Sequence, residues 1–355
     1  MKTLAFFNNK GGVGKTTLIY HLAWMFADMG KKVLVADLDP QANVTSMFLP
    51  ESELEKLWDP DVDSKQSIMA SISPLIRGLG DIGPAPVHSI TSRLRLIPGD
   101  LNLSSFESRL SESWIKCLDR DEAAFRVTSA FHRLTRTAAE EFGADIILID
   151  VGPNFGAINR SALISADAVV VPLAPDLFSI QGLRNLGPTL RRWREEWSER
   201  RVKNPEPSLD LPVGSMTPLG YVVLQFGIRD SRPVKAYDKW SKRIPETFNN
   251  SVIGGTNQLP LDYGLDDHHL GLLKHYRSLI PMAMEVKKPI FHLKAADGAI
   301  GAHNASVKGR PRISLKSNGL IPSRETKPLT KWDYSGIKTQ FASLPPRNGG
   351  ILSTV

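Results

Sequence analysis

Cysteine is nearly absent from this sequence of 355 residues, in which Cys117 is the single example. One thiol cannot form an intrachain disulfide framework, and it cannot supply a cysteine-based zinc or iron–sulfur site within one chain. Long apolar runs are also missing, because no stretch approaches the roughly 18 apolar residues that a transmembrane helix needs. The amino terminus lacks the long apolar core and the cleavage site of a secretory signal. These absences predict a soluble cytoplasmic protein without membrane association.

Excess positive charge is confined to the end of the chain. The sequence has 44 Lys and Arg against 37 Asp and Glu, which gives a net charge of +7. Residues 301–355 contain nine cationic and two acidic residues, so they carry the whole excess and residues 1–300 are neutral. From about Asn304 the chain is rich in Ser, Pro, Gly, Lys and Arg, a composition typical of disorder. We expect one folded domain at 1–303 and a basic, flexible tail at 304–355.

The remaining pattern alternates between strands and helices. A short apolar run at 3–8 is followed by a glycine-rich loop, a helical pattern from Leu18 to Met29, and an apolar strand at 32–39. Further strands are predicted at 94–98, 144–150, 166–173 and 219–226. Helices are predicted at 103–141, at 181–202, near 233–248 and near 270–286, with a partly helical insertion at 51–90. This alternation favours an α/β fold in which helices cover both faces of a doubly wound, mostly parallel sheet.

A phosphate-binding loop is predicted at KGGVGKTT, Lys10–Thr17, because this segment follows a strand and opens a helix. Its glycines allow backbone N–H groups to close on a polyphosphate, and the helix N-terminus adds positive potential. Lys15 can reach the β- and γ-phosphates, and the hydroxyl of Thr16 can ligate Mg²⁺. A glycine turn with an incidental lysine is the alternative. The predicted nucleotide contacts are Gly11, Gly12, Val13, Gly14, Lys15, Thr16 and Thr17.

Three carboxylates end predicted strands. Asp150 closes the most apolar strand, ADIILID, at the edge where open α/β sheets bind ligands, and we expect it to hold a water on Mg²⁺. Asp37 and Asp39 end the strand before Pro40, and strand alternation places them on the same side. One of them could contact the metal shell while the other orients the attacking water. Turn chemistry before the proline is the alternative for Asp37.

Several of these segments resemble the ParA/MinD/Soj family of ATPases. KGGVGKTT resembles the family's deviant Walker A box, in which Lys10 is the additional lysine, and DLDPQANVT resembles its switch I. IILIDVGPNFGAINRSAL resembles the Walker B strand and switch II, followed by ADAVVVPLAPDLFSIQGL. RLIPGDLNLSSFESRL and MAMEVKKPIF are also similar to family segments, so the resemblance covers residues 2–303. Gly152 departs from the pattern, because the family often has a second proline beside Pro153.

The resemblance implies an ATPase with ATP and Mg²⁺ that forms a nucleotide-sandwich homodimer. In that dimer Lys10 would reach the partner's phosphates, Asp39 would orient the hydrolytic water, and Asp37 and Asp150 would reach Mg²⁺ through water. The sequence starts at its first strand without a preceding helix-turn-helix, which favours the short, Soj-like class of ParA proteins.

The resemblance also implies nonspecific DNA binding by the ATP dimer and a small partner protein that stimulates hydrolysis. Such a protein would be cytoplasmic or nucleoid-associated and would position or segregate a plasmid, a chromosome or another cargo. The helix predicted at 181–202 is rich in arginine and is one candidate for DNA contact. A solvated helix surface is the alternative, since Glu195, Glu196 and Glu199 interleave with its arginines. The tail is a second candidate for DNA contact. The candidate DNA contacts are Arg191, Arg192, Arg194, Arg200, Arg201, Lys203, Lys287, Lys288 and Lys294.

A second hypothesis gives the chain a different role. It would be an ATP-switched regulatory or scaffold subunit that recruits a partner enzyme or a defence complex, with little DNA binding. The insertion at 51–90 and the tail at 304–355 depart most from the family core, and they would supply that specificity.

Overall fold

The computed structural model of the chain describes residues 1–59, 66–225, 239–255, 266–274 and 279–298. The tail predicted at 304–355 lies outside these residues, as does the first part of the helix predicted near 233–248. The domain boundary at 303 therefore stays a prediction.

Eight strands in the described part of the chain form one sheet, in the order β3-β4-β2-β5-β1-β6-β7-β8. Neighbouring strands are parallel except β3, which is antiparallel to β4. The strands are β1 (Lys2–Phe6), β2 (Val33–Leu38), β3 (His88–Ser89), β4 (Leu94–Ile97), β5 (Ile146–Val151), β6 (Ala168–Leu173), β7 (Thr217–Gln225) and β8 (His269–Lys274).

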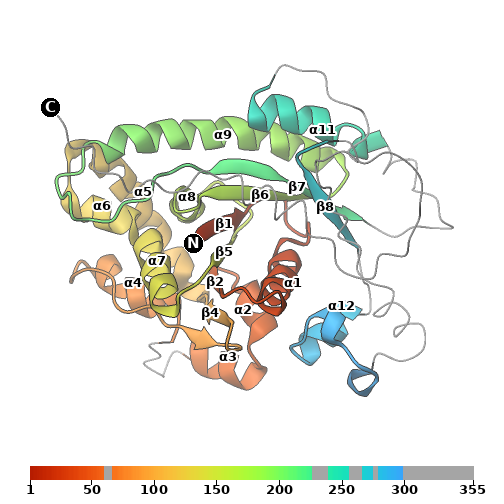
Figure 1. Cartoon of the computed structure of the whole chain (residues 1–355). Helices are drawn as coiled ribbons and strands as arrows, with labels where there is room; N and C mark the ends of the chain where they lie inside the picture. The colour runs from red at the N-terminus through yellow and green to blue at the C-terminus, as the bar shows by residue number, and fades with distance from the viewer. Residues whose placement is uncertain (60–65, 226–238, 256–265, 275–278, 299–355) are drawn as a thin grey trace.

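Helices connect most of the parallel strands, and the longest described helix, α9, runs along one side of the molecule (Figure 1). Asp176 accepts a hydrogen bond from the N–H of Ser179 and thereby caps α9, which begins before the predicted residue 181. The helices are α1 (Lys15–Asp28), α2 (Asn43–Phe48), α3 (Glu51–Trp58), α4 (Ile68–Arg77), α5 (Phe106–Lys116), α6 (Glu122–Thr128), α7 (Ala130–Phe142), α8 (Ala157–Ile164), α9 (Leu177–Arg201), α11 (Ile244–Thr247) and α12 (Leu279–Glu285).

Each face of the sheet has its own hydrophobic core, because side chains alternate between the faces along each strand. Leu34 and Ile147 point to the face that α4–α9 and α11 cover. Val35 and Leu148 point to the opposite face, which α1, α2 and α3 cover. Strands β2, β5 and β6 are buried along their whole length, as expected when helices cover both sides of a parallel sheet. The prediction of a doubly wound α/β fold is confirmed.

One predicted helix is wrong in its first half. The segment predicted as a helix near 270–286 begins with β8 (His269–Lys274), which pairs in parallel with β7, and among its described residues the helical ones belong to α12 (Leu279–Glu285). A short apolar run such as HLGLLK fits a buried strand and a helix face equally well. The pairing with β7 makes this segment a strand, and the local sequence pattern does not predict that pairing.

The segment 279–298 packs against the helices beside the sheet (Figure 1). The N–H of Ile290 donates to Nε2 of His21 on α1 at 3.2 Å, and Lys287 Nζ donates to the carbonyl of Ser46 on α2 at 2.6 Å. These contacts attach the segment to α1 and α2. Among the helices that the structure describes, none is both long and apolar enough to cross a membrane.

Candidate nucleotide-binding site

The carboxyl ends of β1, β2 and β5 meet at one edge of the sheet. Asp150, on β5, is in register with Phe6 of β1 on one side and with Asp37 of β2 on the other. Ligands of open α/β sheets bind at such an edge. The register therefore places the predicted carboxylates beside the loop that leaves β1.

The predicted phosphate loop connects β1 to α1. Gly12 and Gly14 have φ angles of 74° and 72°, in the left-handed region that glycine adopts without strain. Gly14 is the N-cap of α1, so the unpaired N–H groups of the first helical turn face the loop. A cavity of about 340 Å³ opens here. It is lined by every residue from Lys10 to Thr17 and by Asp39, Asn43, Ser46, Met47, Pro153 and Met284.

Lys15 links the phosphate loop to the end of β5. Its ammonium lies 2.7 Å from Oδ1 of Asp150 and also donates to the carbonyl of Val151. The hydroxyl of Thr16 donates to Oδ2 of the same aspartate at 2.9 Å. The structure thus brings Lys15, the predicted phosphate-binding residue, and Thr16, a predicted metal ligand, to the buried carboxylate of Asp150.

Asp37 and Asp150 are neighbouring carboxylates that are both completely buried. Burial raises the pKa of Asp37 to about 7, and the nearby charge of Asp150 contributes to the rise. Burial also raises the pKa of Asp150, while the ammonium of Lys15 opposes that rise. Two adjacent carboxylates of this kind favour a cation between or beside them.

Asp37 also has a structural role. It accepts hydrogen bonds from the backbone N–H and the hydroxyl of Thr45, at 2.9 and 2.7 Å. Thr45 in turn accepts a hydrogen bond from the N–H of Gly99 at 2.8 Å. The carboxylate of Asp37 therefore fixes α2 against the end of β2. It also accepts the N–H of Asp39 at 3.2 Å, which agrees with the turn interpretation of this residue.

Asp39 differs from Asp37 because it lines the cavity. Its Oδ2 lies 3.7 Å from Nζ of Lys15, and its Oδ1 accepts the N–H of Gln41 at 3.0 Å. Gly152 lies close to this carboxylate, because a Cβ added at Gly152 would be 3.4 Å from Oδ1 of Asp39. This carboxylate is positioned to contact a water in the cavity.

Lys10 lies at the border of the cavity and is held within its own chain. Its ammonium contacts the carboxylate of Asp176, and it lies 5.7 Å from the ring centroid of Phe178. Phe178 is 71% exposed. Asp176 was not among the predicted site residues, although an aspartate directly before a helical pattern is a recognisable N-cap signal.

Two further side chains hold the loop after Asp150, and sequence reasoning missed both. The side-chain amide of Asn159 on α8 bonds to the backbone of Gly152 and Asn154. The carboxylate of Glu107 on α5 accepts the N–H groups of Ala157 and Ile158, the first two residues of α8. Glu107 lies in the family-like segment 95–110 but is about 50 residues away from its partners in sequence, so that segment alone does not reveal the contact.

The arginines of α9 that were predicted to contact DNA are largely engaged inside the protein. Arg191 donates to the carbonyl of Ser251 at 2.9 Å, and Arg194 donates to the carbonyl of Ser215 at 2.8 Å. Arg200 is only 6% exposed, and it donates to the carbonyl of Trp114 while lying over that ring. The burial of Arg200 against α5 argues against a DNA contact at this side chain.

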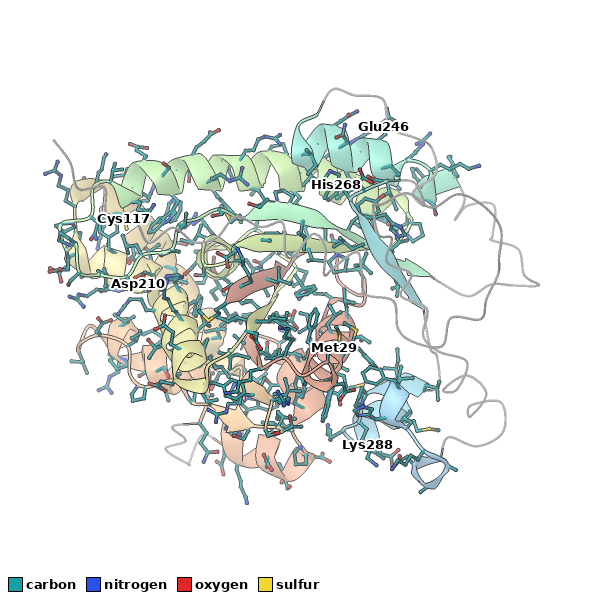
Figure 2. The ribbon with its side chains drawn as sticks, viewed as in Figure 1. Met29, Cys117, Asp210, Glu246, His268 and Lys288 are labelled. Atoms are coloured by element: carbon teal, nitrogen blue, oxygen red, sulfur yellow. The ribbon has the colours of Figure 1, made fainter. Side chains whose placement is uncertain are left out.

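The other basic residues that were predicted to contact DNA do not lie together on one face of the protein. Arg192 and Arg201 are exposed on α9, whereas Lys287 and Lys288 belong to the segment after α12. Figure 2 shows Lys288 on the opposite side of the molecule from α9. Lys288 also pairs with Asp297 at 2.6 Å. The predicted cations therefore form two separate groups.

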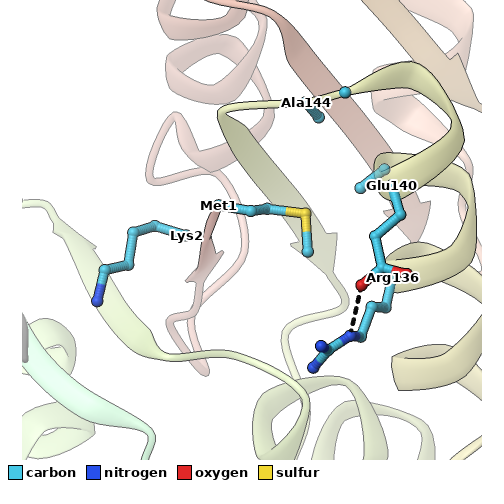
Figure 3. Close-up of a pocket in the computed structure, with 7 residues that line it drawn as sticks. Met1, Lys2, Arg136, Glu140 and Ala144 are labelled. Atoms are coloured by element: carbon cyan, nitrogen blue, oxygen red, sulfur yellow. Dashed lines mark hydrogen bonds and ion pairs between the residues drawn. The ribbon is translucent and has the colours of Figure 1, made fainter. Parts of the chain in front are cut away.

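A second cavity, of about 430 Å³, lies at the other edge of the sheet (Figure 3). It is lined by Met1 and Lys2 at the start of β1 and by α7 residues that include Arg136 and Glu140, which pair at 2.8 Å. This edge holds the amino ends of the parallel strands, away from the phosphate loop. None of the predicted site residues lines this second cavity.

A family model described as an AAA domain matches residues 1–203, which is more than half of the chain. The match includes the phosphate loop and the three strand-end carboxylates described above. The chain belongs to the ParA/MinD/Soj family of P-loop ATPases. The resemblance inferred from the sequence motifs is thereby confirmed.

Curated ParA-like relatives match the first part of the chain. The sporulation initiation inhibitor protein Soj of Bacillus subtilis is 30% identical over 192 residues, which are 54% of this chain and 65% of Soj. The chromosome partitioning protein ParA of Caulobacter vibrioides is 27% identical over 201 residues, which are 56% of this chain and 66% of ParA. The chain thus spans about two thirds of the length of these relatives.

Solved structures show the same fold over a longer range. Protein DIP2308 of Corynebacterium diphtheriae has a TM-score of 0.61 at 28% identity, covering 81% of this chain and 97% of its own. An ATP complex of a McdA variant from Cyanothece has a TM-score of 0.56 at 18% identity, covering 87% and 95%. A putative plasmid partition protein of Borrelia burgdorferi, bound to AMPPNP, has a TM-score of 0.52 at 20% identity, covering 86% and 97%.

Proposed function

We propose that this ParA-like protein binds ATP at its phosphate loop, dimerises in the ATP-bound form and hydrolyses ATP to ADP and phosphate. The observation that carries the proposal is the meeting of Lys15, Thr16 and Asp150 beside a cavity that Asp39 and Lys10 also line. ATP and AMPPNP complexes of structures with this fold support a nucleotide as the ligand.

Each side chain in the cavity has a distinct role in the proposal. Lys15 would exchange its contacts with Asp150 and Val151 for the oxygens of the β- and γ-phosphates. Asp39 would orient the attacking water, because it is the strand-end carboxylate that lines the cavity beside Lys15. Lys10 would leave Asp176 and neutralise phosphate charge on the nucleotide of a second copy.

The same residues fit a magnesium ion. Mg²⁺ prefers oxygen ligands and keeps several waters, and Thr16, Asp37 and Asp150 supply a hydroxyl and two carboxylates. Within the described residues no group of three His, Cys, Asp or Glu side chains could hold a metal alone, so phosphate oxygens would complete the site. Thr16 would bind the ion directly, and Asp37 and Asp150 would bind its waters. When bound, Mg²⁺ neutralises charge that develops on the phosphates.

The proposed biological role is the positioning or segregation of DNA or another cargo. We propose that the ATP dimer binds DNA without sequence preference and that a small partner protein stimulates hydrolysis. The names of two similar proteins, a chromosome partitioning protein and a putative plasmid partition protein, support this role. Exposed cations that would contact the phosphates of DNA include Arg192 and Arg201 on α9. The basic residues of 304–355 are further candidates.

DNA affinity measured against salt concentration tests this role. Binding to a DNA of arbitrary sequence should require ATP and fall steeply with salt, because several phosphates are neutralised. A Lys15→Ala variant should bind neither ATP nor DNA. A chain truncated at about Asn304 separates the two groups of cations, since full ATP-dependent binding without the tail places the contacts on the folded domain. DNA binding that ignores nucleotide would contradict the proposal.

A second candidate function is favoured by one observation. Arg191, Arg194 and Arg200 are bonded to backbone carbonyls within the protein, which leaves α9 fewer free cations than its sequence suggests. An ATP-switched subunit that recruits a protein partner would need no such cations. ATP-dependent dimerisation without measurable DNA binding would support this function instead.

A further inference from the structure

The loop that joins Asp150 to α8 is fixed by one buried side chain. Asn159, in the first turns of α8, is 1% exposed and directs its amide at residues 152–154. Its Oδ1 accepts the N–H of Gly152 at 3.1 Å, and its Nδ2 lies 2.8 Å from the carbonyl of Gly152 and 2.6 Å from that of Asn154. One amide therefore satisfies both backbone groups of Gly152, a geometry that holds the peptide units on both sides of this residue.

This loop contacts the residues proposed to carry the chemistry. The carbonyl of Val151 accepts a hydrogen bond from Lys15, and Pro153 lines the nucleotide cavity. Gly152 lies between two side chains, since an added Cβ would be 3.4 Å from Oδ1 of Asp39 and 3.6 Å from Nδ2 of Asn159. A change in the path of Gly152 would therefore move the backbone against the carboxylate proposed to orient water.

We infer that Asn159 is a positioning residue for ATP hydrolysis, an inference that rests on the proposed ATPase function. Asn159 is separated from Asp39 by Gly152, so it acts through the loop and not by contact with the nucleotide. It holds Gly152 at the distance from Asp39 that leaves room for the water. Misplacement of reacting groups by about 1 Å can reduce a rate by about 100-fold, so this distance is sensitive.

The rest of α8 is anchored independently of Asn159. Glu107 accepts the N–H groups of Ala157 and Ile158, which are free donors at a helix N-terminus. Ser161, on the same helix and 2% exposed, donates to the carbonyl of Thr128 at 2.8 Å. Loss of the Asn159 amide should therefore release the loop 152–154 while α8 stays in place.

The backbone N–H of residue 152 is part of the same group of hydrogen bonds. Gly152 has an N–H to donate, whereas a proline at this position would have none. The substitution Gly152→Pro therefore removes the bond to Asn159 from the other side. Asn159→Ala would still remove the two bonds that Nδ2 donates to backbone carbonyls in the Gly152→Pro background, so the two substitutions together should lower kcat by less than the product of their separate effects.

The test compares Asn159→Ala with Ser161→Ala, which removes one buried hydrogen bond from the same helix but none from the loop. We expect Asn159→Ala to lower kcat by about tenfold or more while KM for ATP stays within about threefold. In the nucleotide-free protein, hydrogen–deuterium exchange over residues 151–157 should become faster in Asn159→Ala. Ser161→Ala should retain kcat and the exchange of that segment.

The outcomes separate this inference from the proposed function. Equal kcat values in Asn159→Ala and Ser161→Ala, or unchanged exchange over 151–157, would overturn the positioning role while the ATPase assignment stands. Equal losses of kcat and of thermal stability in both variants would reduce Asn159 to a structural residue. A wild-type chain that binds ATP but does not hydrolyse it would refute the proposed function, and the inference would fall with it.

Discussion

The ammonium of Lys10 contacts the carboxylate of Asp176, the residue that caps the N-terminus of α9. Both side chains are about one-third exposed, at 31% and 34%. The lysine proposed to act on a second copy is thus held by its own chain beside the nucleotide cavity. A dimer that uses Lys10 in trans must first break this ion pair.

Removal of the charge on Asp176 should therefore favour the dimer. Asp176→Asn keeps an oxygen that can accept the N–H of Ser179, so the cap of α9 survives while the ion pair is lost. A pair this exposed contributes at most about 1 kcal/mol, and a symmetric dimer breaks one pair in each copy, so the ATP-dependent dimer should form at up to about 30-fold lower protein concentration. Sedimentation in low salt measures the change.

Two controls define this prediction. Asp176→Ala loses the cap as well and should cost about 1 kcal/mol of stability. Lys10→Ala should leave nucleotide binding intact and weaken the dimer. An unchanged dimerisation constant for Asp176→Asn at low salt would show that the ion pair does not restrain Lys10.

Arg200 should prove to be a structural residue and not a DNA contact. Its guanidinium donates to the carbonyls of Trp114 and Glu196 and lies over the indole of Trp114. Arg200→Ala leaves the buried Trp114 carbonyl without this donor, so unfolding should become easier by roughly 2 kcal/mol. Exposed Arg192 provides the matched control, because Arg192→Ala should change stability by less than about 0.5 kcal/mol. Equal stabilities of the two variants in urea titrations would be inconsistent with this assignment.

His21 should make the docking of residues 290–293 sensitive to acid. Burial lowers the pKa of His21 to about 4, and its neutral Nε2 accepts the N–H of Ile290. Between pH 6.5 and 4 the unfolded chain binds a proton at His21 that the folded chain does not. This contribution to stability is complete above pH 6.5 and is lost as pH falls, by roughly 3 kcal/mol at pH 4.

A His21→Gln variant isolates this effect, because glutamine does not titrate. The raised pKa of Asp37 has the opposite sign, since the folded chain binds a proton there before the unfolded chain does, and it is common to both proteins. The difference in free energy of unfolding between wild type and His21→Gln should therefore shift against the wild type as pH falls. A difference that is constant from pH 7 to pH 4 would rule out His21 as the sensor.

The sequence was sufficient to predict the phosphate loop and the strand-end carboxylates. Lys15, Thr16 and Asp150 lie in segments whose local pattern, a strand followed by glycines or by a turn, also determines their place in the fold. The doubly wound sheet followed from the same alternation. In these cases the chemistry and the local structure are encoded by the same few residues.

Other features depend on contacts between distant segments and were not predictable. β8 is a strand because β7 lies beside it, and Arg200 is buried because Trp114 on α5 covers it. Glu107 and Asn159 lie in segments that resemble the family, but their contacts emerge only when α5, α8 and the loop after β5 meet. The sequence pattern of α9 does not distinguish the exposed Arg192 from Arg200, which is buried against Trp114.

The central claim is that the cavity beside Lys15 and Asp39 hydrolyses ATP and that ATP joins two copies. The most direct measurement is the mass in solution of an Asp39→Ala variant with ATP and Mg²⁺, alongside its rate of phosphate release. We expect negligible hydrolysis and a stable species of twice the chain mass of 39.2 kDa, which disappears when Lys15→Ala is added. A monomer with bound ATP, or hydrolysis at the wild-type rate, would contradict the central claim.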